Sequence, residues 1–147
     1  MSVAKICVRE VDFAESQEPV WQAAERMHQR VVGCLIIAND KGEPEGIVTD
    51  RDLVERVVAQ GKDPNSTLVA DVMTHNPTTI TEVASTELAL ALMRDRGFRR
   101  LPVVNPDGKV VGMLTLDDIL MQLSQEFKLV GELLVRESPQ GVAGESV

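Results

Sequence analysis

The sequence is poor in aromatic residues and carries no excess of basic charge, and both shortages exclude nucleic acid as a partner. Phe and Trp make up only 3% of the 147 residues, Tyr does not occur, and the formal net charge is −8. Proteins that hold single strands stack the bases on aromatic rings. Binding to a phosphate backbone also needs a basic surface. We therefore expect no nucleic-acid partner.

Cysteine and long apolar runs are scarce as well. Two cysteines, Cys7 and Cys34, are too few for a disulfide framework, and Cys34 lies in an apolar run that is typical of a buried, reduced thiol. That run, 31–38, is the longest apolar stretch and far shorter than the ~20 residues that cross a bilayer. The first residues lack the apolar core of a signal peptide. We expect a cytoplasmic protein with no membrane partner.

The main positive feature is an internal repeat. When the sequence is shifted by 66 positions, identical residues coincide without a gap over about fifty residues. The coincident residues are turn glycines, core aliphatics and a Thr/Asp pair. They include Leu35 with Leu101, Asn39 with Asn105, Gly42 with Gly108, Gly46 with Gly112, Thr49 with Thr115, and Asp52 with Asp118. The chain is therefore two copies of one unit.

Each copy has the pattern of a β-α-β-β-α unit. Periodicity and turn residues predict, in order, a short strand, a helix, a hairpin and a closing helix. The strands are expected at 7–11, 34–38 and 46–49, and at 78–81, 101–104 and 110–114. The first helix of copy two begins after Ser85 or Thr86. Its run 88–93 is apolar all round, which predicts burial on more than one face. The fold class is α+β, with the two repeats packed as a pseudo-two-fold pair.

The same pattern sets the domain limits. We assign 1–66 to repeat one with a polar linker, 67–130 to repeat two, and 131–147 to the end of the last helix and a disordered tail. The last helix keeps an apolar stripe beyond the repeat, to about Leu134. This stripe and Trp21 suggest a homodimer, and the alternative for both is ordinary core packing.

The junction between the last strand and the last helix carries the chemistry. Copy one reads Gly-Ile-Val-Thr-Asp-Arg-Asp over 46–52, and copy two reads Gly-Met-Leu-Thr-Leu-Asp-Asp over 112–118. Together with the segments 69–80 and 98–104, this pattern resembles tandem CBS (cystathionine beta-synthase-type) domains over residues 3–127. The resemblance implies a stand-alone regulatory pair, or Bateman module. Such a module binds AMP, ADP, ATP or S-adenosylmethionine as a ligand and has no catalytic cofactor.

Elementary chemistry is consistent with a nucleotide site at this junction. A Thr hydroxyl and backbone N–H groups at a helix N-terminus favour phosphate. A carboxylate can accept hydrogen bonds from two ribose hydroxyls. Thr-x-x-Asp is also a helix capping box, worth ~1 kcal/mol without any ligand. Capping and binding can coexist at one junction.

The resemblance implies two composite clefts, each combining the Thr/Asp pair of one repeat with early strands of the other. The better equipped cleft would contain Thr49, Arg51, Asp52, Thr74, Thr79, Ile80, Arg100, Leu101 and Pro102. The other would contain Val11, Phe13, Cys34, Leu35, Ile36, Thr115 and Asp118. Copy one has Gly33-Cys34 where copy two has Arg99-Arg100. We therefore expect no tight binding of a phosphorylated ligand in the second cleft.

Two other classes of function stay open at this point. One is a scaffold that dimerises and binds no ligand. The other is an enzyme, such as a nucleotide hydrolase that uses Asp52 or Asp118, but no carboxylate cluster for its metal is evident, so we expect no catalytic residue and no metal site. His28 and His75 lie in different copies without a second ligand at metal-binding spacing. His75 borders the first cleft and could contact phosphate. A regulated protein would be a partner in trans.

Overall fold

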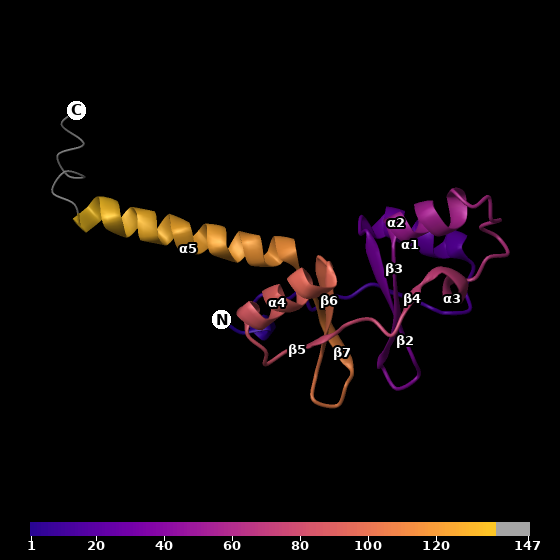
Figure 1. The fold of residues 1–147 in the computed structure, drawn as a ribbon, viewed down its shortest axis with the longest axis horizontal. Helices are drawn as coiled ribbons and strands as arrows, with labels where there is room; N and C mark the ends of the chain where they lie inside the picture. The colour runs from indigo at the N-terminus through magenta and orange to yellow at the C-terminus, as the bar shows by residue number, and fades with distance from the viewer. Residues whose placement is uncertain (138–147) are drawn as a thin grey trace.

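The computed structural model describes residues 1–137 and confirms an α+β fold of two similar units (Figure 1). The predicted disordered tail, 138–147, lies outside the described residues. The first unit comprises β1 (Phe13–Ala14), α1 (Val20–Arg30), β2 (Cys34–Ala38), β3 (Pro44–Thr49), α2 (Asp50–Leu53) and the π-helical turn η2 (Val54–Val58). The second comprises β5 (Ile80–Thr81), α4 (Thr86–Arg96), β6 (Arg100–Val104), β7 (Val110–Thr115) and α5 (Leu116–Glu137). Three short elements, η1 (Val3–Lys5), α3 (Val69–Val72) and β4 (Thr74–His75), open the two copies.

The two units have the same strand pairing. In each unit a short strand lies parallel to the first hairpin strand, and the hairpin is antiparallel with an irregularity at the matching place, Ile37/Ala38 and Val103/Val104. Gly42 and Gly108 both have positive φ in the hairpin turns, which explains the glycines that the repeat retains. The tips of the two hairpins touch, because the Val110 N–H donates to the Gly42 carbonyl at 2.9 Å.

The opening segments of the two copies are exchanged. β4 of copy two pairs with β3 of the first unit, and Val8 of copy one bridges Met113 of the second unit. The strand predicted over 7–11 is therefore wrong: in that segment only Val8 forms a bridge, and the first strand of copy one is Phe13–Ala14. The reason is that the segment binds the edge of the other unit.

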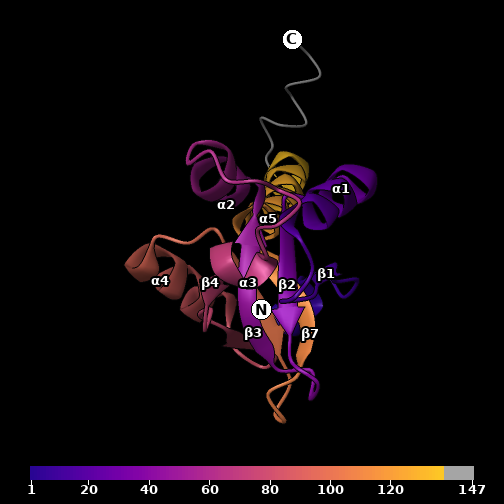
Figure 2. The same cartoon turned by 90° about the vertical axis from the view of Figure 1, so that its right-hand side faces the viewer.

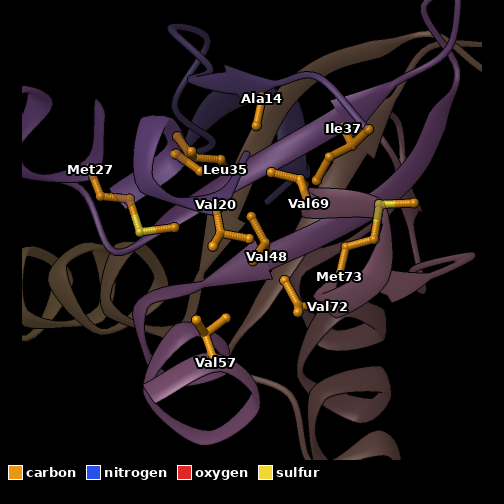
Figure 3. Close-up of a cluster of buried hydrophobic side chains, with 11 residues drawn as sticks. Ala14, Val20, Met27, Leu35, Ile37, Val48, Val57, Val69, Val72 and Met73 are labelled. Atoms are coloured by element: carbon orange, nitrogen blue, oxygen red, sulfur yellow. The ribbon is translucent and has the colours of Figure 1, made fainter. Parts of the chain in front are cut away.

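This exchange gives each core residues from both copies. Val69, Val72 and Met73 complete the core of the first unit, as Figure 3 shows, and Val3 belongs to the core of the second. Ile36 and Pro102 are fully buried but belong to neither core. Because side chains alternate along a strand, these two residues lie on the opposite face of each hairpin. The two sheets therefore meet through those faces, and Figure 2 shows β2 and β3 in front of β7.

Two helices of the second unit are less covered than the sequence suggests. The expectation that α4 is buried on more than one face is wrong, because Leu88 and Leu90 are exposed and the helix buries only Ala89 and Met93. The predicted start of α4 is confirmed, because Ser85 is its N-cap and the Ser85 hydroxyl accepts from the Leu88 N–H at 3.1 Å. α5 begins against the body and then projects away from it (Figure 1). None of the helices in residues 1–137 combines the length and hydropathy needed to cross a membrane.

Candidate functional site

The strand-to-helix junctions of the two copies have the same geometry. The Thr49 hydroxyl accepts from the Asp52 N–H at 3.1 Å, and the Asp52 carboxylate accepts from the Thr49 N–H at 2.9 Å. Thr115 and Asp118 form the same two bonds at the same two distances. Each Thr/Asp pair is therefore a capping box, which confirms the capping interpretation of the Thr-x-x-Asp pattern.

Capping leaves part of each pair free for other bonds. A Thr hydroxyl that accepts one hydrogen bond still has its own proton to donate, and a carboxylate has a second oxygen. Since Cys34 pairs with Thr49 and Arg100 with Thr115 in the strand register, both junctions lie at the end of the sheet faces that meet. The arrangement can hold a ligand that offers an anionic group to the hydroxyl and hydroxyl groups to the carboxylate.

At the first junction an arginine joins the carboxylate to the exchanged segment. Arg56 Nη2 lies 3.5 Å from Asp52 Oδ1, while Arg56 Nη1 donates to the Val72 carbonyl at 2.7 Å and to the Thr74 hydroxyl at 3.3 Å. The structure thus brings Thr74 to the same arginine as Asp52, two residues that the sequence placed in one cleft. The arginine also supplies a countercharge for the acid, whose side chain is only 14% exposed.

The pKa of Cys34 reports the charged groups around the first junction. The pKa of its thiol is raised to about 12, mainly by burial; the positive charge of Arg100 lowers this pKa, and nearby Asp52 and Asp50 raise it. Arg100 is thus close to Cys34 of the other repeat and is also the register partner of Thr115. It is therefore related to the second junction by its strand pairing and to the first by the effect of its charge on Cys34.

The second junction has a different electrostatic setting. Burial raises the pKa of the Cys7 thiol, Arg9 lowers it, and Glu82 and Asp118 raise it, so these three charged groups lie around Cys7. Arg9 is occupied by Glu82 at 3.3 Å. Gln122 stands at the position that matches Arg56, 66 residues further on. Among residues 1–137, Asp118 therefore has no ion pair like that of Asp52 with Arg56.

The other predicted site residues fall into three groups. The side chains of Ile80 and Leu101 lie in the second core and that of Leu35 in the first, so a ligand would meet only their main chain. Pro102 and Ile36 are buried between the two sheets, and Phe13 is the strand partner of Ile36. Thr79 and Val11 lie in the chain just before β5 and β1. Arg51 is bonded to Glu55 at 2.6 Å and is highly exposed.

Two arginines near the junctions, Arg56 and Arg9, were not among the site residues predicted from the sequence. Arg56 lies one helical turn after Asp52, a spacing that puts the two side chains on one face, but it is equally typical of a surface ion pair. Arg9 and His75 occupy matching positions, and each contacts the carbonyl of the matching alanine, Ala4 at 3.3 Å and Ala70 at 3.1 Å. The gapless repeat would have revealed this equivalence.

Hollows and metal ligands add nothing to the junctions within residues 1–137. A hollow of about 120 Å³ lies between the N-terminus, α4 and α5, and another of about 210 Å³ lies on α1 beside Trp21. Neither is lined by the Thr/Asp pairs. In the same residues no group of three His, Cys, Asp or Glu side chains is placed to hold a metal ion. His28 is exposed on α1.

The duplicated unit also occurs in known proteins. The CBS domain family model matches residues 3–59 and 69–125. An uncharacterized protein of Methanopyrus kandleri is 39% identical over 120 residues, which is 82% of this chain and 61% of the relative. The chain thus spans about three fifths of that relative's length.

Solved structures have the same architecture. The CBS domain pair of protein MJ0100, in complex with 5′-methylthioadenosine and S-adenosyl-L-methionine, has a TM-score of 0.77 and 25% identity, covering 86% of this chain and 98% of that one. CBSX2 in complex with AMP has a TM-score of 0.72 and 26% identity, covering 84% and 96%. The chain belongs to the CBS domain family, as a tandem pair of such domains.

Proposed function

We propose that this CBS pair is a regulatory module that binds an adenosine-containing ligand between its two repeats. The observation that carries the proposal is the duplicated Thr/Asp junction, with matching distances in both copies, at the faces where the sheets meet. Solved relatives with the same fold hold AMP, or 5′-methylthioadenosine and S-adenosylmethionine. The Asp carboxylate would hold the ribose, and the Thr hydroxyl with the helix N-terminus would hold the group at its 5′ end.

The first cleft, at Thr49 and Asp52, suits a phosphorylated nucleotide such as AMP. Arg56 offsets the charge of Asp52, and the charge of Arg100 acts on Cys34, the strand partner of Thr49. A charge-assisted bond to phosphate is about twice as strong as a neutral one. Arg51, bonded to Glu55, would have to exchange partners to take part.

The second cleft, at Thr115 and Asp118, suits a less anionic adenosine compound. Asp118 and Glu82 lie there with Arg9, whose guanidinium is already bonded to Glu82. These three groups together carry net negative charge, which disfavours a phosphate, whereas a thioether or sulfonium group at the 5′ position would not be repelled. The two clefts would then respond to different ligands in one protein.

Ligand binding regulates only if it favours one arrangement of the repeats over another. The exchanged segments offer such an arrangement, because Arg56 links the Asp52 carboxylate to Val72 and Thr74, which come from the other copy. A ligand that draws Asp52 toward its ribose would change that link. The module would pass this change to a regulated protein in trans.

Thermal unfolding with AMP, ADP, ATP, NAD and S-adenosylmethionine tests the proposal. A ligand present at 100 times its Kd adds about 2.7 kcal/mol of stability, which is roughly 5–10 °C for a domain of this size. The matched control is the double variant Asp52→Ala/Asp118→Ala, which should lose the shift. If none of the five compounds raises Tm in the folded wild-type protein, the Thr/Asp pairs are helix caps only and the module is a ligand-free scaffold.

A further inference from the structure

The hollow between the N-terminus, α4 and α5 differs from the matching region of the first unit. It has a volume of about 120 Å³ and lies where Figure 1 shows the N-terminus beside α4. Its lining includes Ile6 of the opening segment and Gln122 of α5. In the first unit Arg56 stands at the position of Gln122 and donates to the carbonyl of Val72, which matches Ile6. An arginine thus joins the helix to the opening segment in one unit, and a hollow lies between them in the other.

The charges of the two regions are also exchanged. Glu87 and Glu126 line the hollow, whereas Trp21 and Gln60 occupy the matching positions of copy one. Neither carboxylate forms an ion pair with a cation of residues 1–137. Glu87 also favours the start of α4, but Glu126 lies well inside α5, where the helix dipole does not act. At these positions copy one has an arginine and no acid, and copy two has two acids and no basic side chain.

The walls of the hollow indicate which kind of cation fits. Ile6, Ile119 and Leu123 are apolar, and a guanidinium group is planar and weakly hydrated, whereas an ammonium group holds its water strongly. A guanidinium can therefore lie against these side chains and still donate to acceptors in its own plane. Within residues 1–137 no three acidic, His or Cys side chains are placed to hold a metal ion. Because a cavity of about 150 Å³ holds benzene, the hollow has room for the smaller guanidinium group.

We infer that this hollow binds the guanidinium group of a small alkylguanidinium compound. Glu87 and Glu126 supply the countercharge. The Ile6 carbonyl accepts no hydrogen bond from within residues 1–137 and is free to accept one, as the Val72 carbonyl does from Arg56. The bound group joins α5 to the opening segment of copy one, which is the connection that Arg56 makes in the first unit. The inference stands whether or not the clefts bind adenosine ligands.

Two probes of equal charge test the chemistry of the site. Agmatine and putrescine are both dications with the same carbon chain, and only agmatine carries a guanidinium group. NMR titration of the wild-type protein should show saturable binding of agmatine, at least fivefold tighter than that of putrescine. Equal binding would mean that a chain of net charge −8 merely attracts cations, and absence of saturable agmatine binding would mean that the hollow holds only water. Either result overturns the inference.

Two matched substitutions on α5 test the place of binding. Gln122→Arg gives the second unit the arginine that the first unit has, so it should raise Tm by roughly 2–4 °C and abolish agmatine binding. Gln125→Arg adds the same charge at an exposed position that does not line the hollow, and it should leave the affinity for agmatine within twofold. Undiminished binding in Gln122→Arg, or an equal loss in both variants, would place the site elsewhere.

Removal of one carboxylate tests the countercharge without filling the hollow. Glu126 is exposed, so Glu126→Gln should leave the fold intact and should weaken agmatine binding at least threefold. Glu132→Gln is the control, because Glu132 lies on the same helix and pairs with Lys128 instead. Its affinity for agmatine should stay within twofold of wild type. If the two substitutions weaken binding equally, the attraction comes from the overall charge of the chain and the assignment to this hollow is wrong.

Discussion

The two clefts of this CBS pair have the same capping geometry and different charge. Asp52 and Asp118 accept the same hydrogen bond at the same distance, yet Asp52 has Arg56 at 3.5 Å and Asp118 has Gln122 at the matching position. Duplication therefore preserved the part of the junction on which the helix start depends. The charged groups around the carboxylate, on which the choice of ligand would depend, differ between the copies. The repeat therefore predicts where the sites are and not what each one binds.

The largest expected effect comes from Arg100, which pairs with Thr115 and whose charge acts on Cys34 of the other repeat. Arg100→Gln removes the cation that lowers the pKa of Cys34 and should weaken AMP binding roughly tenfold to a hundredfold, the range for one charged hydrogen bond. Binding of uncharged adenosine should change little. Calorimetric titration with both compounds checks this, and an equal loss for both would show that Arg100 acts on the shape of the cleft rather than on phosphate.

Arg56→Gln should make the first cleft resemble the second. The change removes the bonds to Val72 and Thr74 and the countercharge of Asp52. Because the arginine is 40% exposed, we expect a loss of only about 1 kcal/mol in urea unfolding, with AMP bound several-fold more weakly. Arg51→Gln, at the exposed pair with Glu55, is the control and should cost less than about 0.5 kcal/mol. Equal costs would contradict the role given to Arg56.

The ends of α1 and α4 offer a second comparison between the copies. Val31 and Gly97 occupy matching left-handed positions, with φ of 55° and 71°. A side chain with Cβ is disfavoured there and glycine is not. Val31→Gly should therefore stabilise the protein by about 0.5–1 kcal/mol, and Gly97→Val should destabilise it by at least as much. Chemical unfolding of both variants measures this, and destabilisation by Val31→Gly would mean that the exposed valine makes a contact in the assembled protein.

A further effect is confined to alkaline pH. Burial raises the pKa of Cys34 from 9.0 to about 12, so the folded protein keeps a proton that the unfolded chain loses. Its contribution to stability is complete below pH 9 and is lost as the pH rises from about 9 to 12, by at most about 1.4 kcal/mol per pH unit. Cys34→Ala should remove this slope. Identical pH profiles for the two proteins would show that the thiol is not desolvated.

Much of the fold could be predicted because its signals are local. The turns at Asn39 and Asn105, the cap at Ser85 and the Thr/Asp pairs act within a few residues. The gapless repeat shows the turns and the Thr/Asp pairs twice. The exchange of the opening segments could not be predicted, because the choice of sheet edge for Val8 or Thr74 depends on how the two units pack. Arg56 was missed for the same reason, since two of its three partners belong to the exchanged segment.

The most direct test of the account is a calorimetric titration of AMP into wild type, Asp52→Ala and Asp118→Ala, each checked to be folded. The two substitutions remove the same capping bond, so that their structural cost is matched. The account predicts that Asp52→Ala loses AMP binding and that Asp118→Ala keeps it within a few-fold. Loss of binding in Asp118→Ala with retention in Asp52→Ala would contradict the assignment of phosphorylated ligands to the first cleft.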